Sequence, residues 1–129
     1  MNCLNAFYWC KALTSIELSA TLTTIGEGAF LGSGLTTVTF AEGINLTTTG
    51  SYAFEGCSSL TSIVLPSSVT YIGSYAFYYC SSLTSINFNG TMAEWKAISK
   101  GYSWNSYMPS DYKVYCTDGT LDINDNQVA

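Results

Sequence analysis

The chain has 129 residues and a net charge of −5, because four lysines face nine acidic side chains and arginine is absent. This balance argues against a nucleic-acid partner, which requires a basic surface, and against an anionic lipid surface. Histidine is absent too, which removes the commonest general base and the commonest metal ligand. The length suits one folding unit with a continuous core.

The chain begins almost inside its first recognisable pattern. Residues 1–5 contain neither the charged n-region nor the hydrophobic h-region of a signal peptide. The longest apolar runs are far shorter than the roughly 20 residues that cross a bilayer, so we expect no direct membrane insertion. We interpret the chain as the C-terminal piece of a longer repeat protein. An uncovered strand edge and core end around residues 6–18 predict a homo-oligomer formed through this N-terminal edge.

One phrase, Ala-Phe-x-x-Cys-x-x-Leu-x-x-Ile, recurs with variations at a spacing of about 23 residues. Its copies begin at Ala6, Ala29, Ala53 and Ala76. Self-similarity at this period is typical of a solenoid, in which one short unit cannot bury its apolar face and stacks on copies of itself. The repeat therefore predicts a solenoid of about four coils over residues 1–90.

Each unit begins with a predicted strand that has one buried face, because apolar residues alternate with polar ones. The four strands are expected within residues 13–18, 35–40, 60–65 and 83–88. Their equivalent apolar residues are expected to stack in one column, formed by Ile16, Val38, Ile63 and Ile86.

A second short apolar segment follows in the clearest units, over residues 22–26 and 69–73. Its final glycine, Gly26 or Gly73, is expected to permit a turn with positive φ into the next phrase. The Ala-Phe-x-x-Cys stretch then predicts a tight helical or 3₁₀ turn with the Ala and Phe side chains packed inward.

The second unit differs from the others. It has one residue fewer before Leu35, Ser33 in place of the expected cysteine, and two additional residues within 41–49. Solenoids tolerate such changes as loop bulges, because each coil contacts only its neighbours. A loop bulge is the favoured interpretation, and a functional loop is the alternative.

The phrase ends at Phe88, and the following residues predict a helix-plus-hairpin cap. Thr91 and Glu94 have capping-box spacing, and the helix is expected to turn Trp95, Ala97 and Ile98 inward. Asp118-Gly119 is a two-residue hairpin signal between strands predicted at 112–117 and 120–123. Because a solenoid must cover its last open edge, we expect a capping segment over residues 91–123 and a polar tail over 124–129.

Three of the five cysteines, Cys10, Cys57 and Cys80, occupy the same repeat position. Buried free thiols are the favoured interpretation, because unpaired cysteine usually behaves as a small buried hydrophobe. Neighbouring coils lie roughly 5 Å apart, so distance alone permits a Cys57–Cys80 disulfide, although a side-by-side ladder seldom supplies the required Cβ directions. No Cys-x-x-Cys pair exists to supply a zinc site.

The remaining chemistry-bearing residues do not form a reactive set. Without histidine, the cysteines lack the usual partner of a thiol nucleophile. The acidic residues near the C-terminus are expected in solvated turns: Asp111, Asp118, Asp122 and Asp125. The stretch 122–126 matches the first three ligand positions of a calcium loop but lacks its later glycine and glutamate. We therefore expect no enzyme, no catalytic residues, no cofactor and no metal site.

Two sets of exposed residues are the candidate partner-binding sites. Solvent-facing strand residues are expected to form two columns: Ser15, Thr37, Ser62 and Ser85, and then Glu17, Thr39, Val64 and Asn87. Aromatic side chains at shared repeat positions form the second set, Tyr52, Tyr75, Tyr78 and Tyr79. Such surfaces suit extended solenoid interfaces or aromatic contacts. The alternatives are an ordinary polar strand surface and a compositional habit without a ligand.

The repeated phrase, together with Pro66 and Ile72-Gly73, resembles the BspA-like branch of leucine-rich repeats, and residues 88–119 resemble the closing segment of such proteins. The resemblance implies a mainly β, short right-handed leucine-rich-repeat solenoid, found on secreted or cell-surface proteins and often linked to adhesion. We therefore expect a non-catalytic binding module in an extracellular or cell-surface parent protein, with a protein partner for adhesion or protein–protein interaction. The alternatives are an inert structural spacer and a carbohydrate-binding surface.

Overall fold

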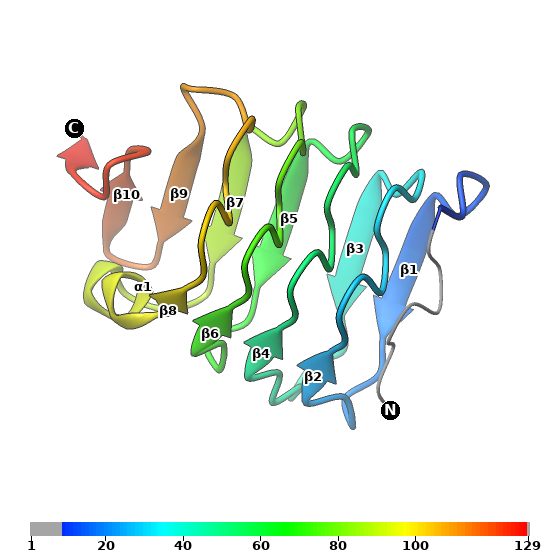
Figure 1. Cartoon of the computed structure of the whole chain (residues 1–129). Helices are drawn as coiled ribbons and strands as arrows, with labels where there is room; N and C mark the ends of the chain where they lie inside the picture. Colours follow the sequence, from blue (N-terminus) through cyan, green and yellow to red (C-terminus); the bar gives the residue numbers. More distant parts are fainter. Residues whose placement is uncertain (1–8, 129) are drawn as a thin grey trace.

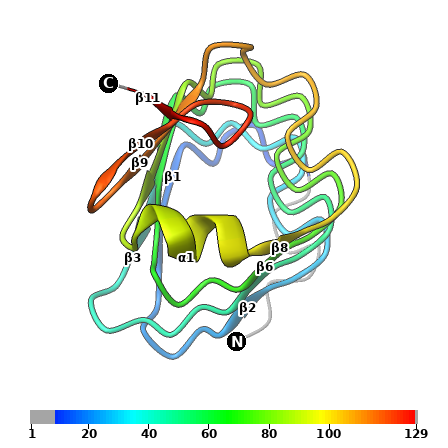
Figure 2. The same ribbon diagram turned by 90° about the vertical axis from the view of Figure 1, so that its left-hand side faces the viewer.

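A computed structural model gives the structure of residues 9–128. The chain winds through successive coils into one solenoid (Figure 1). In cross-section each coil has the longer strands on one side, a row of short strands on a second side, and turns that return the chain along the third (Figure 2). The expectations for the N-terminal residues, the copy at Ala6 and Cys3 lie outside the described residues.

The predicted strands form the first side of the solenoid. They are β1 (Ser15–Leu18), β3 (Thr37–Phe40), β5 (Ser62–Leu65) and β7 (Ser85–Phe88). Neighbouring strands pair in parallel and place equivalent residues opposite one another, Ile16 with Val38 and Ile63 with Ile86. The strand pattern therefore predicted both the elements and their register.

The ladder of long strands is interrupted between β3 and β5. These two strands are in contact but belong to different sheets. In the first pair, Ala41 N donates to Leu18 O at 2.9 Å, and in the third, Asn89 N donates to Leu65 O at 3.0 Å. The equivalent residue after β5 is Pro66, which has no N–H to donate. This proline and the longer loop of the second unit coincide with the interruption.

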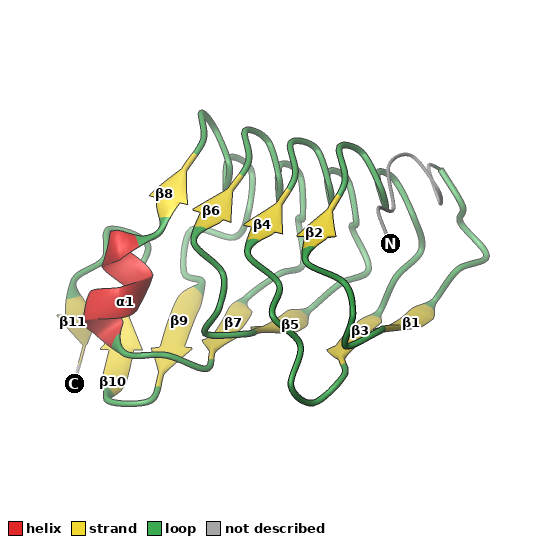
Figure 3. Ribbon diagram, turned by 90° about the horizontal axis from the view of Figure 1, so that it is seen from below, coloured by secondary structure: helices red, strands yellow, loops and turns green. Residues whose placement is uncertain are grey.

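Short strands form the second side of the coil (Figure 3). They are β2 (Thr24–Ile25), β4 (Thr48–Thr49), β6 (Tyr71–Ile72) and β8 (Ser99–Lys100), joined in parallel in that order. The predicted second apolar segments at 22–26 and 69–73 therefore contribute strands of only two residues, within a continuous four-stranded row.

The expectation of a positive φ at Gly26 and Gly73 was wrong, since the left-handed residue lies two positions later, at Gly28 (φ 64°) and Tyr75 (φ 60°). Close approach of neighbouring coils explains the glycine at position 73. A Cβ atom there would lie 2.4 Å from Ser51 N and 2.6 Å from Gly50 C. The glycine is needed for coil-to-coil packing.

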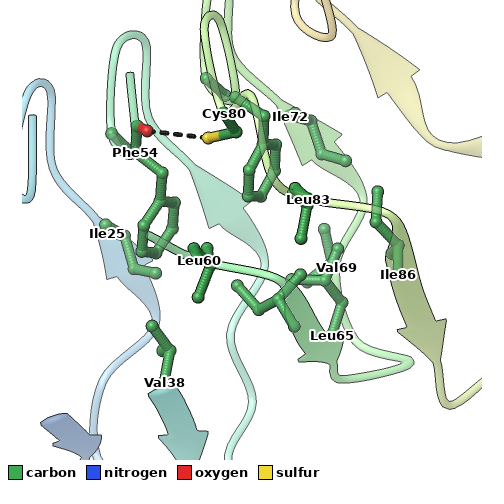
Figure 4. Packing of buried hydrophobic residues seen from close by; sticks show 14 of the residues in the cluster. Ile25, Val38, Phe54, Leu60, Leu65, Val69, Ile72, Cys80, Leu83 and Ile86 are labelled. Carbon is green, nitrogen blue, oxygen red and sulfur yellow. Dashed lines mark hydrogen bonds between the residues drawn. The ribbon is translucent and has the colours of Figure 1, made fainter. Parts of the chain in front are cut away.

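The core consists of equivalent apolar side chains stacked from coil to coil (Figure 4). Phe30, Phe54 and Phe77 are fully buried and stack with ring centroids 5.4 and 5.3 Å apart. Aromatic pairs of this kind contribute about 0.5–1.5 kcal/mol beyond the burial of their area. The Ala-Phe turns point inward as predicted, and they form a succession of tight turns.

The register cysteines are free thiols. Cys57 Sγ donates to Phe30 O at 3.2 Å. Figure 4 shows the equivalent bond in the next coil, in which Cys80 Sγ donates to Phe54 O at 3.1 Å. Both side chains are fully buried, as predicted. Cys10 is only half-buried, contrary to the prediction, because it lies at the N-terminal end of the described coils.

The closing segment begins with α1 (Met92–Ala97), which lies between β7 and β8. The predicted capping box is confirmed: Glu94 N donates to Thr91 Oγ1 at 3.1 Å, and Thr91 N donates to Glu94 Oε1 at 2.9 Å. Trp95 and Ile98 are buried as expected. Ala97 is exposed, so the inward face of this short helix is narrower than predicted.

The coil path continues beyond the last copy of the phrase. After α1, β8 extends the row of short strands, and β9 (Lys113–Cys116) extends the row of long strands by pairing in parallel with β7. Trp104 packs edge-on against Phe77, with ring centroids 6.3 Å apart. The segment expected to be only a cap therefore completes a further coil, with tryptophan next to the last core phenylalanine.

The predicted hairpin is present, but its turn is shifted by one residue. Strand β10 (Gly119–Leu121) pairs antiparallel with β9, and Gly119 lies opposite Cys116. The two-residue loop is therefore 117–118. A Cβ atom at Gly119 would lie 2.8 Å from Met92 Cε, at the mobile end of a flexible side chain. The expected polar tail also contains β11 (Gln127–Val128), which pairs antiparallel with β10.

Candidate functional site

The strand-face candidates lie side by side as the repeat register requires. Ser15 lies opposite Thr37 and Glu17 opposite Thr39. Beyond the interruption, Ser62 lies opposite Ser85 and Val64 opposite Asn87. All are exposed except Ser85 and Asn87, which are half-buried. The interruption therefore divides this face into two shorter ladders, and its role in partner binding stays a prediction.

A hollow of about 540 Å³ opens beside the interruption between β3 and β5. Phe40 at the end of β3 and the loop residues Glu42 and Ile44 line the hollow, together with Val64 and Pro66. The irregular unit thus shapes the surface here. The lining is mostly apolar, and its polar residues are Thr39, Glu42, Ser67 and Asn89.

The third side of the solenoid carries a continuous tyrosine cluster, which we call the tyrosine face. Its rings form an unbroken series of contacts, with centroid separations between 4.5 and 5.8 Å. The members are Tyr52, Tyr75, Tyr78, Tyr79, Tyr102 and Tyr107. All four tyrosines predicted as binding residues are therefore brought together.

Much of the tyrosine face is open to solvent. The exposed fractions are 75% for Tyr102, 63% for Tyr107 and 49% for Tyr79. Desolvation, followed by the neighbouring tyrosines, raises the pKa of Tyr78. The face offers aromatic area with hydroxyl groups at its margins, a combination that is enriched at protein interfaces.

Four tyrosines of this face have a left-handed backbone. The φ angle is 61° at Tyr52, 60° at Tyr75, 60° at Tyr79 and 65° at Tyr107. Residues other than glycine pay roughly 1–2 kcal/mol for this conformation. Strain of this kind, held by the surrounding structure, is found preferentially at functional sites.

Glycine occupies equivalent left-handed positions in other coils. Hydrogen bonds place Gly28, Tyr52 and Tyr75 in one column, because their N–H groups donate to the carbonyl oxygens of residues 51, 74 and 102. A second column contains Trp9, Gly32, Gly56, Tyr79 and Tyr107. The N–H groups of its first three members donate to the carbonyl oxygens of residues 31, 55 and 78. The fold itself therefore accepts glycine where tyrosine is present.

Two members of the tyrosine face were missed by sequence reasoning. Tyr102 and Tyr107 lie after the phrase ends, and no repeated letters mark their positions. The one available signal is Gly101-Tyr102 followed by Trp104, which parallels the spacing from Gly73 through Tyr75 to Phe77 with one residue fewer after the glycine.

Other kinds of site find no support within residues 9–128. This part of the chain holds no group of three or more Cys, Asp or Glu side chains that could bind a metal ion. Asp122 Oδ1 accepts hydrogen bonds from Asn124 N and Asn126 N, at 2.9 and 3.0 Å, within a local turn. The helix found over this range is too short to cross a membrane.

The comparisons with known proteins identify the repeat. A family model described as BspA type leucine-rich repeat region matches residues 4–102 in six copies. The crystal structure of the pneumococcal vaccine antigen PcpA is similar, with a TM-score of 0.61 and 19% identity over 85% of this chain and 34% of that chain. A comparison with curated proteins finds no match.

A second solved structure is a leucine-rich cell surface protein from Faecalibacterium prausnitzii A2-165. It has a TM-score of 0.50 and 30% identity over 77% of this chain and 32% of that chain. This chain thus spans about a third of the length of these two proteins. The family model covers most of the sequence, and the coils carry its phrase in register. The chain therefore belongs to the BspA-type leucine-rich repeat family.

Proposed function

We propose that the chain is a non-catalytic protein-binding module of a secreted or cell-surface repeat protein, and that the tyrosine face is its contact surface. The observation that carries the proposal is the left-handed backbone of Tyr52, Tyr75, Tyr79 and Tyr107. Glycine serves the same backbone positions in other coils, so the fold does not require tyrosine there, and we assign the tyrosines a role through their side chains.

The composition of the face favours a protein partner. Tyrosine supplies rigid amphipathic area at a low cost in side-chain entropy, and it is among the residues that dominate binding energy at protein interfaces. The family and its cell-surface structural relatives support a binding or structural role for the repeat. Adhesion is the specific activity that we propose for it.

An inert spacer is the competing function. A spacer needs stacked coils and a polar surface, and glycine in the left-handed columns would serve it with less backbone strain. The tyrosine face therefore separates the two functions. The strand face is the alternative contact surface, because its polar ladders also extend along the coils.

The test compares two surface variants with the unmodified chain on a panel of immobilised extracellular-matrix proteins and on a glycan array. The first variant combines Tyr52→Gly with Tyr75→Gly, which suits the left-handed backbone. The second combines Thr37→Ala with Ser62→Ala on the strand face. We expect protein capture that the first variant loses and the second retains. Tyr102→Ser, at the most exposed ring, provides an independent variant should the double variant fold poorly.

Three outcomes would contradict the proposal. Capture lost only in the strand-face variant would move the contact surface to the long strands. Binding to glycans without protein capture would make the chain a carbohydrate-binding module. No binding to either panel would favour the inert spacer.

A further inference from the structure

A slot lies next to the tyrosine face, in the second left-handed column, between the aromatic residues Trp9 and Tyr79. Its cavity, of about 390 Å³, is lined by Trp9, Leu31, Glu55, Gly56 and Tyr79. Two aromatic residues of one column thus stand on either side of a glycine, with a carboxylate beside it. We call this cavity the Trp9–Tyr79 slot.

The ring of Tyr79 forms one wall of the slot. Tyr107 stacks on this ring with centroids 4.5 Å apart and planes inclined by only 6°. Gly56 is the column neighbour of Tyr79 on the side away from Tyr107, as the hydrogen bond from Gly56 N to Tyr78 O shows. A flat group placed above Gly56 would therefore continue the ring stack.

The floor of the slot has room for such a group. A Cβ atom added to Gly56 would meet nothing closer than Gly32 Cα at 3.8 Å. By contrast, a Cβ atom on Gly32 would lie 2.3 Å from Trp9 Cε3. The indole thus covers Gly32 and bounds the slot at its other end, while the surface above Gly56 stays open.

The Glu55 carboxylate is the charged group of the slot. Desolvation alone raises the pKa of Glu55, and neither a neighbouring cation nor a hydrogen-bond donor acts to lower it. Among the described residues, no hydrogen bond or ion pair to the Glu55 carboxylate is found. An uncharged ring in the slot would desolvate this carboxylate further without compensation.

We infer that the slot binds an arginine side chain of a protein partner, with the guanidinium plane on the Tyr79 ring and its N–H groups donating to the Glu55 carboxylate. The guanidinium group is planar, stacks on aromatic faces and forms two parallel hydrogen bonds to a carboxylate. The chain itself has no arginine and a net charge of −5, which favours a basic partner. This inference rests on the proposed function, because it names the partner chemistry at the margin of the same face.

Lys11 determines where in the slot the guanidinium binds. Its Nζ atom lies 5.3 Å from the centroid of the Trp9 ring, so the indole already carries one cation. A second cation is therefore placed at the Tyr79 end, beside Glu55. Glu55 attracts the guanidinium there, whereas Lys11 lies at the Trp9 end of the slot and does not act on the Glu55 carboxylate.

The experiment titrates the full chain, labelled with ¹⁵N, with an acetylated and amidated Gly-Gly-Arg-Gly-Gly peptide. We expect saturable shifts at the amides of Glu55 and Gly56. The matched peptide with citrulline has the same shape without the charge, and should leave these amides unshifted. Glu55→Gln should weaken binding of the arginine peptide about tenfold. Lys11→Gln, at the Trp9 end of the slot, is the matched charge control and should change the affinity by less than about twofold.

Equal shifts with the arginine and citrulline peptides, or unchanged affinity in Glu55→Gln, would overturn the inference. Saturable shifts with neutral oligosaccharides but not with the arginine peptide would make the slot a sugar site. Glu55→Gln also separates this inference from the proposed function. Protein capture that survives in Glu55→Gln and is lost in the Tyr52→Gly, Tyr75→Gly variant would support the tyrosine face as the contact surface. The same result would overturn the inference that the slot binds arginine.

Discussion

Tyr52 stacks on Tyr75 with ring centroids 5.2 Å apart and planes inclined by 5°, although each residue has a left-handed backbone. The two conformations are equivalent because both residues occupy the same column of the solenoid. Stacking contributes about 0.5–1.5 kcal/mol, which is close to the roughly 1–2 kcal/mol that left-handed backbone costs each residue. Because both residues carry this cost, the single stacking contact offsets only part of it. The exposed area of the pair is available for a partner.

Replacing Tyr52 with glycine should change the free energy of unfolding by less than about 1 kcal/mol, because relief of backbone strain offsets the lost stacking. Tyr52→Val is the matched control. A β-branched residue at φ 61° keeps the backbone strain and loses the ring. Tyr52→Val should therefore be less stable than Tyr52→Gly by about 1–3 kcal/mol. Urea denaturation measures both. Equal stabilities of the two variants would contradict the left-handed conformation.

Gly73→Ala should destabilise the protein by about 1–3 kcal/mol, the usual cost of overpacking. The added methyl group would lie 2.4 Å from Ser51 N, and backbone of the neighbouring coil cannot move aside as a flexible side chain can. Gly43→Ala is the control, because its φ is 78° and a Cβ atom there meets nothing within 4 Å. Thermal denaturation should therefore show that Gly43→Ala lowers the free energy of unfolding by only about 1 kcal/mol, the cost of placing alanine in a left-handed backbone. A larger loss at Gly43 than at Gly73 would reverse this explanation.

One physical reason explains why most coils of the solenoid could be predicted from the repeat and the closing segment could not. Stacked coils place equivalent residues in equivalent surroundings, so β5 and β7 could be read from the same letters. The coil completed by β8 and β9 packs against only one neighbouring coil, and Trp104 follows the core phenylalanines there without the phrase around it. Periodicity therefore ended before the solenoid did.

The candidate site was predictable to the same extent. Tyr52 and Tyr75 share a repeat position, and their proximity followed from the register. The left-handed backbone did not follow, because the glycine signal at Gly73 reflects a close approach between coils and not a positive φ. Similarly, Gly119 lies in a strand opposite Cys116 and not in the hairpin turn. A glycine in the sequence does not distinguish between these two demands.

The buried thiols should make the protein less stable in alkali. Burial raises the pKa of the Cys57 thiol, and raises the pKa of the Cys80 thiol well above its usual range. Stability is therefore complete below about pH 9. As the pH rises further, the unfolded thiols release protons that the folded ones retain. Each such thiol then lowers the free energy of unfolding by about 1.4 kcal/mol per pH unit.

Urea denaturation between pH 7 and pH 11 measures this dependence, and Cys80→Ala should reduce its slope. The same burial protects both thiols from a thiol reagent in the native protein, while the half-buried Cys10 and Cys116 should react first. Native labelling of Cys80 as fast as that of Cys116 would contradict the buried geometry. A free energy of unfolding that stays constant up to pH 11 would contradict the raised pKa values of the two thiols.

The closing segment should be essential for a soluble monomer. Removing residues 90–129 would uncover the edges of β6 and β7, which pair with β8 and β9, and exposed strand edges invite aggregation. It would also remove Trp95, which is fully buried, contacts Phe88 at a centroid distance of 5.5 Å and donates through Nε1 to Asp125 Oδ1 at 3.2 Å. We expect insoluble or oligomeric protein, measured by light scattering.

Trp95→Ala tests the same segment in the complete chain. Truncating a buried tryptophan should cost about 3–5 kcal/mol, whereas Tyr102→Ala, at a ring that is 75% exposed, should stay within about 0.5 kcal/mol. The difference follows from position, since the two aromatic residues lie in the same closing segment but only Trp95 covers the end of the core. A shortened chain that remains a soluble monomer with an unchanged thermal midpoint, or equal stabilities of the two variants, would show that the repeats close on themselves without this segment.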